Sequence, residues 1–421
     1  MKVGIIGSGG REHAICSFIN KSKRVKEIYC IPGNAGTAQI AKNLDININD
    51  FETIKTCIIE NSIELLIVGP EEPLVKGIVD FLKDTPVKVF GPNKSASQLE
   101  GSKTFTKNLC KKYEIPTAKF GIFENPSDSK KFLENSNYPI VIKADGLAAG
   151  KGVYICENQG EAFQAIDEIF NGKFGIANNL LIEEFLEGEE MSYFVVCDGN
   201  NIKSFETAQD HKRVLEGDKG KNTGGMGAYS PSSLINPELE TKIIDQIIKP
   251  TLKAIREIGE IYLGFLYAGL MIKDNEPYLI EYNVRMGDPE CQTILPLLKS
   301  DLLDLINSCC EKKLEKTNIE WYEKKSLCIV LCSNGYPESY KKNIEIPNFF
   351  NLEHDNKNFI YHAGTEVINN KIFATGGRVL NFVSISDEFV NSKNQIIKQI
   401  QKLNWKDGFY RSDIGYKVIK K

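Results

Sequence analysis

The chain has 421 residues, which at ~150 residues per domain corresponds to about three domains, and 42% of the residues are hydrophobic. Its 52 lysines and arginines are balanced by 56 aspartates and glutamates, which argues against a nonspecific nucleic-acid binder because such proteins need a basic excess. No apolar run approaches the ~20 residues of a membrane-spanning helix, and the first residues show no secretory signal pattern. We therefore expect neither a nucleic-acid nor a membrane partner.

Eleven cysteines are scattered along the chain, and none is spaced C-x-x-C. The four histidines are equally dispersed, so no cluster with zinc-ligand spacing is present. This usage is typical of reduced, mostly buried thiols, and we expect a cytoplasmic protein.

The first 92 residues alternate apolar strands with helical stretches. Near-continuous apolar strands separated by helical lengths predict a parallel sheet covered on both faces, a Rossmann-like α/β domain. The predicted strands are 2–7, 27–32, 63–69 and 87–91, and the helical stretches are 11–22, 51–61 and 74–83. Glycine or proline follows each strand, and phosphate-type ligands belong at these carboxyl ends.

The rest of the chain reads as an α+β region followed by a β-rich one. We expect a helix over 94–120 with Ser102 as its N-cap, a strand at 138–144 leading into a glycine-rich segment, a helix near 160–171 and a strand at 179–185. Further strands and a helix near 237–258 follow, then β-like sequence from about 326 and a closing helix around 391–403.

The turn GSGGREH at 7–13 follows a strand and opens a helix, a position where backbone amides attract an anion. It does not fit a dinucleotide site, because Glu12 stands at the third glycine position and the second strand ends without an acidic residue. Arg11 in the first helical turn opposes the helix dipole unless a phosphate neutralises it. By itself the turn fits an ordinary tight connection as well as it fits a phosphate site. The segments PGNAGT (32–37) and GPE (69–71) at neighbouring strand ends favour a sugar-phosphate site.

The segment IKADGLAAGKGV (142–153) is a second glycine-rich stretch. It is not a P-loop, because no Ser or Thr follows Lys151 and a strand follows in place of a helix. Such a loop between two antiparallel strands can fold over a triphosphate, with Lys143 on the ligand side. A hairpin without chemical meaning is the alternative.

The stretch LIEYNVRMGDPECQ (279–292) places Glu281 and Asn283 two residues apart on a strand, so both oxygens point to one face. Hard oxygen ligands suit Mg²⁺ held jointly with phosphates. We expect Arg285 to continue that face and bind an oxyanion, whereas the alternative is an edge strand with a solvated polar face.

Together with further blocks in the right order, these segments resemble the ATP-grasp ligases over nearly the whole length of the chain, and the resemblance to the family of phosphoribosylamine–glycine ligases is close. The further blocks are QLEGSKTFTK, IEEFLEGEEMS, AQDHKR, NTGGMGAYSP, HAGT and GGRVL. The resemblance implies that glycine and 5-phosphoribosylamine are joined at the expense of ATP through glycyl phosphate, an early step of purine biosynthesis. It also implies a cofactor metal, Mg²⁺ or Mn²⁺. We expect a monomer or weak homo-oligomer, although the sequence does not fix the oligomeric state. Many ATP-grasp enzymes carry an extra acidic metal ligand on the strand before Glu281, and here that strand has none.

The resemblance also assigns roles to individual residues. For ATP it implies Lys107, Lys143, Gly150, Lys151, Gly152, Glu183, Glu184, Leu186 and Glu190. For the metal and the acyl phosphate it implies Glu281, Asn283 and Arg285. For phosphoribosylamine it implies Gly9, Arg11, Asn34, Thr37, Glu71 and Arg378, and for glycine Asp210, with His211 and Arg213 as weaker candidates.

The expected architecture is an N-terminal α/β domain (1–103), an ATP-grasp core (104–325) with a lid inserted near 122–189, and a β-rich C-terminal domain (326–421). Other functions stay open at this point. Another ATP-grasp enzyme, such as a carboxylase acting through carboxyphosphate, would share 107–285, and a nucleotide-binding regulator would need the lid loop alone. A dehydrogenase ranks last because the ribose-binding acid is missing.

Overall fold

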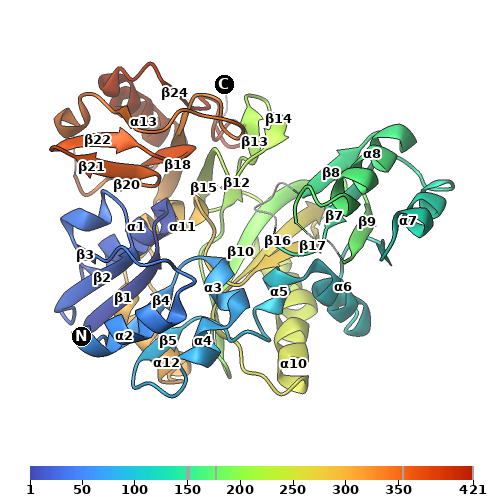
Figure 1. The fold of residues 1–421 in the computed structure, drawn as a ribbon, viewed down its shortest axis with the longest axis horizontal. Coiled ribbons are helices and arrows are strands. Elements are labelled where there is room, and N and C mark those ends of the chain that lie inside the picture. The colour runs from blue at the N-terminus through green and yellow to red at the C-terminus, as the bar shows by residue number, and fades with distance from the viewer. Residues whose placement is uncertain (148–151, 176–177, 353–354, 420–421) are drawn as a thin grey trace.

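The structure, a computed structural model, describes residues 1–147, 152–175, 178–352 and 355–419. Figure 1 shows an N-terminal sheet and a C-terminal β-rich region side by side, with a smaller unit standing apart from both. Among the described residues, no helix combines the length and apolar character that crossing a bilayer requires.

The N-terminal sheet is parallel throughout, as the sequence predicts. In spatial order its strands are β3 (Lys42–Asn43), β2 (Glu27–Pro32), β1 (Lys2–Gly7), β4 (Leu65–Val68) and β5 (Lys88–Phe90). Its helices are α1 (Gly10–Ile19), α2 (Phe51–Asn61), α3 (Glu71–Lys76) and α4 (Ile78–Phe81). The helix expected over 74–83 is thus two short helices, because Gly77 between them adopts φ +96° and ends α3.

The helix expected over 94–120 is wrong in length. The structure has α5 (Gln98–Gly101) and α6 (Lys103–Lys112), and Ser102 caps α6 as predicted, its Oγ accepting from Phe105 N at 3.1 Å. The chain then leaves the helix, since Glu114 has φ +55° and Pro116 offers no backbone donor. Beyond that point it crosses into the lid.

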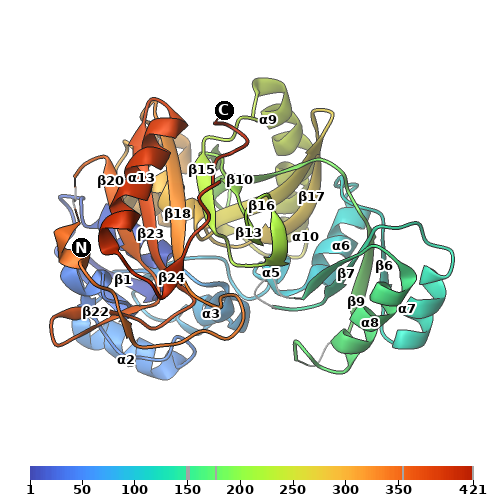
Figure 2. The ribbon, with the colours of Figure 1, turned by 90° about the horizontal axis from the view of Figure 1, so that it is seen from above.

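The lid is a four-stranded antiparallel sheet with two helices and a hydrophobic core of its own. Its strands in spatial order are β6 (Phe120–Phe123), β9 (Leu180–Glu184), β7 (Ile140–Ala144) and β8 (Val153–Cys156), and its helices are α7 (Pro126–Leu133) and α8 (Gln159–Phe170). Figures 1 and 2 both show this unit projecting from the rest of the molecule.

A second antiparallel sheet lies beneath the lid. Its spatial order is β11 (Ile202–Ser204), β10 (Glu189–Asp198), β16 (Leu263–Lys273) and β17 (Glu276–Asn283). The helix expected near 237–258 consists of α9 (Pro237–Ile243), a π-helical turn (Ile244–Ile248) and α10 (Lys249–Glu257). These helices bury their apolar residues in the same core as this sheet.

The C-terminal region is β-rich, as expected, and its main sheet recruits strands from the middle of the chain. The order is β12 (Gln209–Asp210), β15 (Gly227–Ser230), β18 (Lys325–Ser333), β23 (Arg378–Ser386) and β20 (Asn358–His362), with β24 (Gly408–Phe409) on β18. The hairpin β13 (Arg213–Leu215)–β14 (Lys219–Asn222) connects β12 to β15. The remaining elements are β19 (Ile344–Glu345), β21 (Thr365–Ile368), β22 (Lys371–Ala374), α11 (Glu290–Ile294), α12 (Leu302–Cys310) and α13 (Phe389–Leu403).

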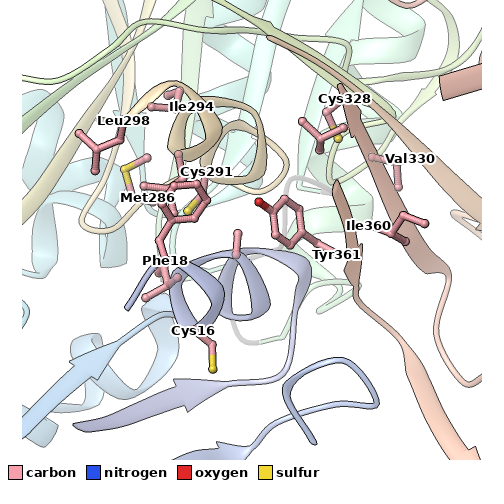
Figure 3. Packing of buried hydrophobic residues seen from close by; sticks show 14 of the residues in the cluster. Cys16, Phe18, Met286, Cys291, Ile294, Leu298, Cys328, Val330, Ile360 and Tyr361 are labelled. Carbon is pink, nitrogen blue, oxygen red and sulfur yellow. The ribbon is translucent and has the colours of Figure 1, made fainter. Parts of the chain in front are cut away.

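Helix α1 joins these units. Nine of its ten residues are buried, and its apolar side chains share one core with α11, β18 and β20. Figure 3 shows Phe18 of α1 beside Met286 and Cys291, and Tyr361 of β20 on another side of the helix. Cys16 points the other way, to the N-terminal sheet, where its Sγ lies 3.7 Å from Cys30 Sγ of β2. The strand ends of the N-terminal sheet are therefore held against the segment that follows β17.

Candidate active site

Two lysines and one carboxylate meet between the lid and the core. Lys143 Nζ of β7 lies 2.8 Å from Glu183 Oε2 of β9, and Lys107 Nζ of α6 lies 3.3 Å from Glu183 Oε1. All three side chains are buried. Burial lowers the pKa of Lys107. For Glu183 burial acts to raise the pKa, but the two ammonium groups outweigh it and hold the pKa below its usual value.

Most of the other residues expected at the nucleoside lie between the end of β9 and the start of β10. Glu184 Oε1 accepts from Lys119 N at 2.9 Å, and Leu186 is half-buried. Glu190 Oε2 lies 2.8 Å from Lys212 Nζ, and the charge of Lys212 lowers the pKa of Glu190. Of the expected loop residues, Gly152 is buried, while Gly150 and Lys151 lie outside the described residues.

Glu281 and Asn283 stand on one face of β17, opposite Gly269 and Tyr267 of β16. A bulge at this point of the ladder precedes Glu281. No third acidic ligand comes from β16, and in the described parts of the chain no three His, Cys, Asp or Glu side chains cluster as a metal site. Two oxygen ligands that leave the remaining positions to phosphate oxygens fit Mg²⁺ bound with a nucleotide.

Arg285 lies beyond the end of β17, and its guanidinium turns to two carboxylates. Its Nη2 donates to Glu100 Oε1 at 2.6 Å and its Nε to Glu71 Oε2 at 3.1 Å. The charge of Arg285 lowers the pKa of Glu71 to about 2, whereas burial raises the pKa of Glu100 to about 7. Sequence reasoning missed Glu100, whose position before the N-cap of α6 gives no functional signal.

The expected sugar-phosphate residues gather at the strand ends of the N-terminal sheet. Arg11 is only 7% exposed, so it is not a solvated surface residue; its Nε donates to Glu12 Oε1 at 2.6 Å and its Nη1 to Met286 O at 3.0 Å. Gly9 N donates to Glu12 Oε2 at 2.7 Å. Arg11 and Arg285 both line one small cavity, of about 20 Å³, whose other walls are mostly apolar.

Asn34 and Thr37 shape the neighbouring turn. Asn34 Nδ2 donates to Ser8 O and to His362 O, each at 2.8 Å, and Asn34 N donates to Thr37 Oγ1 at 2.7 Å. Because His362 belongs to β20, this turn is fixed jointly by the N-terminal and C-terminal regions.

Arg378 and Asp210 lie on the other side of Asp288. Arg378 Nη1 donates to Asp288 O at 2.6 Å, and Asp288 Oδ2 accepts from Arg11 N at 3.1 Å. Asp210 Oδ1 is buried without a hydrogen-bond partner, and the Cα of Gly225 approaches it so closely that an added Cβ would stand 2.8 Å away. Burial and the nearby Glu290 carboxylate raise the pKa of Asp210.

Glu290 was missed from the sequence and is 3% exposed, with Ser192 Oγ donating to its Oε1 at 3.1 Å. The side chains of His211 and Arg213 form hydrogen bonds to residues other than Asp210. His211 Nε2 accepts from Gly415 N at 3.3 Å, and Arg213 Nη1 donates to Gly220 O within the β13–β14 hairpin at 2.7 Å.

One lysine of the lid and one of α6 converge on a lid carboxylate, and a carboxylate–amide pair lies on the last strand of the neighbouring antiparallel sheet. This arrangement defines an ATP-grasp ligase, a class that uses ATP with a divalent metal. Family models for phosphoribosylglycinamide synthetase match as an N domain over residues 1–100, an ATP-grasp (A) domain over 101–291 and a C domain over 326–417. The chain belongs to the phosphoribosylglycinamide synthetase family.

Relatives of full length agree. A phosphoribosylamine–glycine ligase of Brucella melitensis is 43% identical, covering 100% of this chain and 99% of its own length, and one of Caldanaerobacter subterraneus is 44% identical with 99% of each covered. The crystal structure of a phosphoribosylamine–glycine ligase from Thermotoga maritima superposes with a TM-score of 0.87 at 33% identity, covering 99% of this chain and 100% of that one. The fold is shared by the biotin carboxylase domain of a Hydrogenobacter thermophilus 2-oxoglutarate carboxylase, with a TM-score of 0.72. The two chains are 17% identical, and the superposition covers 95% of this chain and 89% of that one.

Proposed function

We propose that this chain joins glycine to 5-phosphoribosylamine, with ATP converted to ADP and phosphate, giving glycinamide ribonucleotide through glycyl phosphate. The observation that carries the proposal is the 3.1 Å contact between Arg285, expected at the acyl phosphate, and Glu71, expected at the sugar amine. The full-length match to the phosphoribosylglycinamide synthetase models supports it.

Lys107 and Lys143 would hold the ATP phosphates. In this structure each ammonium faces Glu183, and a phosphate, with more charge and more acceptor oxygens, would compete for the same donors. Glu183, Glu184 and Leu186 would contact the adenine, and Glu190 the ribose hydroxyls. Lys212, between Glu190 and the Glu281 face, is a further cation available to the transferred phosphoryl group.

Glu281 and Asn283 would ligate Mg²⁺ or Mn²⁺, consistent with their oxygen donors on one face of β17. When bound, the metal would neutralise charge on the phosphoryl oxygens during transfer. Burial lowers the pKa of Lys103, and the charge of Glu281 counteracts part of that lowering.

Asp210 would bind the ammonium group of glycine. Its Oδ1 is buried without a hydrogen-bond partner, the Glu290 carboxylate lies nearby, and burying a carboxylate without a partner is costly, so an ammonium group bound here would be stabilised. Arg285 would then steady the glycyl phosphate. Phosphorylation converts a carboxylate, a poor acyl donor, into one with a leaving group, so the chain needs to position and neutralise rather than supply a nucleophile.

Phosphoribosylamine would bind at the strand ends of the N-terminal sheet, to Gly9, Arg11, Asn34, Thr37 and Glu71. Arg378 would complete the site from the C-terminal region. Two contacts support this arrangement: Arg285 binds Glu71 at 3.1 Å, and Arg11 Nη1 donates to Met286 O, the residue next to Arg285, at 3.0 Å. The amine of the sugar would attack the glycyl carbonyl carbon, the C–O bond to phosphate would break, and the amine would lose a proton.

The test is an ADP-release assay with phosphoribosylamine generated in situ and each substrate omitted in turn. We expect release to require both glycine and the sugar amine, and mass spectrometry to detect glycinamide ribonucleotide. Release that depends on bicarbonate in place of glycine would assign the chain to a carboxylase, and absence of turnover with all three substrates would favour a regulator.

The proposal includes the domain limits 1–103, 104–325 and 326–421, with the lid near 122–189. The main sheet of the C-terminal domain also contains β12 and β15, which come from the 104–325 segment. We further propose a monomer or weak homo-oligomer. We also propose that it lies in the cytoplasm, which the eleven free cysteines support. Light scattering after size exclusion and cell fractionation test these two points.

A further inference from the structure

The end of lid strand β7 is fastened to the start of helix α6 by one carboxylate. Asp145 Oδ1 accepts from Lys103 N at 2.7 Å and from Thr104 N at 3.2 Å, and Ser102 Oγ lies 3.3 Å from Asp145 Oδ2. In return, Lys103 Nζ donates to Gly146 O at 2.9 Å. None of these contacts belongs to a regular sheet or to the helix itself.

The chemistry of a helix start explains why a carboxylate binds there. The first N–H groups of α6 have no partner within the helix, and the dipole of the helix makes this end positive. Ser102 satisfies one of them by accepting from Phe105 N. Asp145 satisfies the two preceding donors with a charged acceptor, which is stronger than a neutral one.

The attachment lies between the two lysines of the nucleotide site. Lys143 is two residues before Asp145 on the same strand, and Lys107 is about one helical turn after Lys103 on the same helix. Both ammonium groups converge on Glu183. The position of β7 relative to α6 therefore sets the separation of the two cations.

We infer that Asp145 is a positioning residue that registers the lid against α6, so that Lys143 and Lys107 present their charges together to the ATP phosphates. The inference rests on the proposed nucleotide site. It assigns Asp145 no contact with ATP, and its effect reaches the nucleotide through the two lysines.

The test compares Asp145→Ala and the conservative Asp145→Asn with the wild-type chain. Affinities for ATP and for adenosine are measured by displacement of a fluorescent ATP analogue. We expect Asp145→Ala to weaken ATP at least tenfold and adenosine less than twofold, because adenosine has no phosphates. Asp145→Asn, which keeps an acceptor oxygen, should recover part of the loss. Asp167→Asn, an exposed lid carboxylate of α8 paired with Lys130, is the matched control and should leave both affinities unchanged.

Equal losses for ATP and adenosine would overturn the inference, since they would show a general disturbance of the lid, and so would unchanged ATP affinity. If Asp145→Ala fails to fold, the ratio of the two affinities in Asp145→Asn decides in the same way. These binding measurements do not require turnover, so they separate a failure of this inference from a failure of the proposed reaction.

Discussion

Arg285 Nε donates to Glu71 Oε2 at 3.1 Å, although the two residues belong to different parts of the fold and lie 214 positions apart in the chain. The contact joins the segment after β17, which follows the candidate metal ligands, to the first turn of α3 at a strand end of the N-terminal sheet. It brings the two ends of the proposed reaction within reach of one guanidinium. Both side chains are largely buried, so Glu71 depends on this partner for compensation of its charge, while Arg285 is also paired with Glu100 at 2.6 Å.

Replacing Glu281 tests the metal site. Glu281→Gln keeps the size of the side chain and removes the charge that a hard divalent cation needs, so we expect turnover to fall by about 100-fold or more. Steady-state ADP release over a Mg²⁺ titration measures it, with circular dichroism as the check on folding. Glu276→Gln, at the other end of β17 and paired with Lys242, is the control. Near-normal activity of Glu281→Gln would remove this residue from the site.

Replacing Lys143 tests the phosphate cluster. Lys143→Met removes one charge-assisted contact worth about 1.5–3 kcal/mol, so we expect the Michaelis constant for ATP to rise roughly 10- to 100-fold. The constant for glycine should change less than twofold. Lys130→Met, in the lid but bound to Asp167 at the surface, should leave both constants unchanged. A defect shared equally by ATP and glycine would contradict the assigned role.

Replacing Arg11 tests the sugar-phosphate site. Arg11→Lys keeps the charge next to Glu12 but loses the planar, multidentate donor, so we expect the Michaelis constant for phosphoribosylamine to rise by about tenfold. The constants for ATP and glycine should stay within twofold of the wild type. Arg24→Lys, at an exposed pair with Asp304, is the control. A defect confined to ATP would mean that the sugar-phosphate site lies elsewhere.

We predict that the buried His13 makes the free energy of unfolding depend on pH. Its Nδ1 accepts from His362 N at 2.9 Å, and burial lowers its pKa to about 3. The unfolded chain binds a proton at this residue below pH ~6.5 and the folded chain does not, so acidification from there to pH ~3 removes up to about 1.4 kcal/mol of stability per pH unit.

The variant His13→Asn isolates this contribution, because its amide oxygen can still accept from His362 N but does not titrate. Urea unfolding at pH 7.5, 6.5, 5.5 and 4.5 gives the slope of the unfolding free energy against pH. We expect a shallower slope in the variant between pH 6.5 and 4.5, whatever its stability at pH 7.5. Parallel slopes in the two proteins would show that His13 is protonated in the folded state.

The local pattern predicted much of the fold. The four main strands of the N-terminal sheet, the Ser102 cap and the closing helix near 391–403 follow from apolar periodicity and capping chemistry, which act over a few residues. The 94–120 helix was predicted too long, because helical composition continues past Lys112 while the chain turns toward the lid. Strands β12 and β15 were not predicted, since both are short and β15, which pairs with β12, joins the sheet through β18, about 100 residues further along the chain.

By itself the sequence determined the parallel first sheet, the glycine-rich turns and the carboxylate–amide pair at Glu281 and Asn283, because these depend on spacing along one strand or turn. The tertiary structure alone decided that Arg285 faces Glu71 and Glu100, that Glu290 stands beside Asp210, and that Asp145 binds the start of α6. Each of these pairs joins segments distant in the chain, and the energy that selects them comes from burying charges beside one another, which no local pattern records.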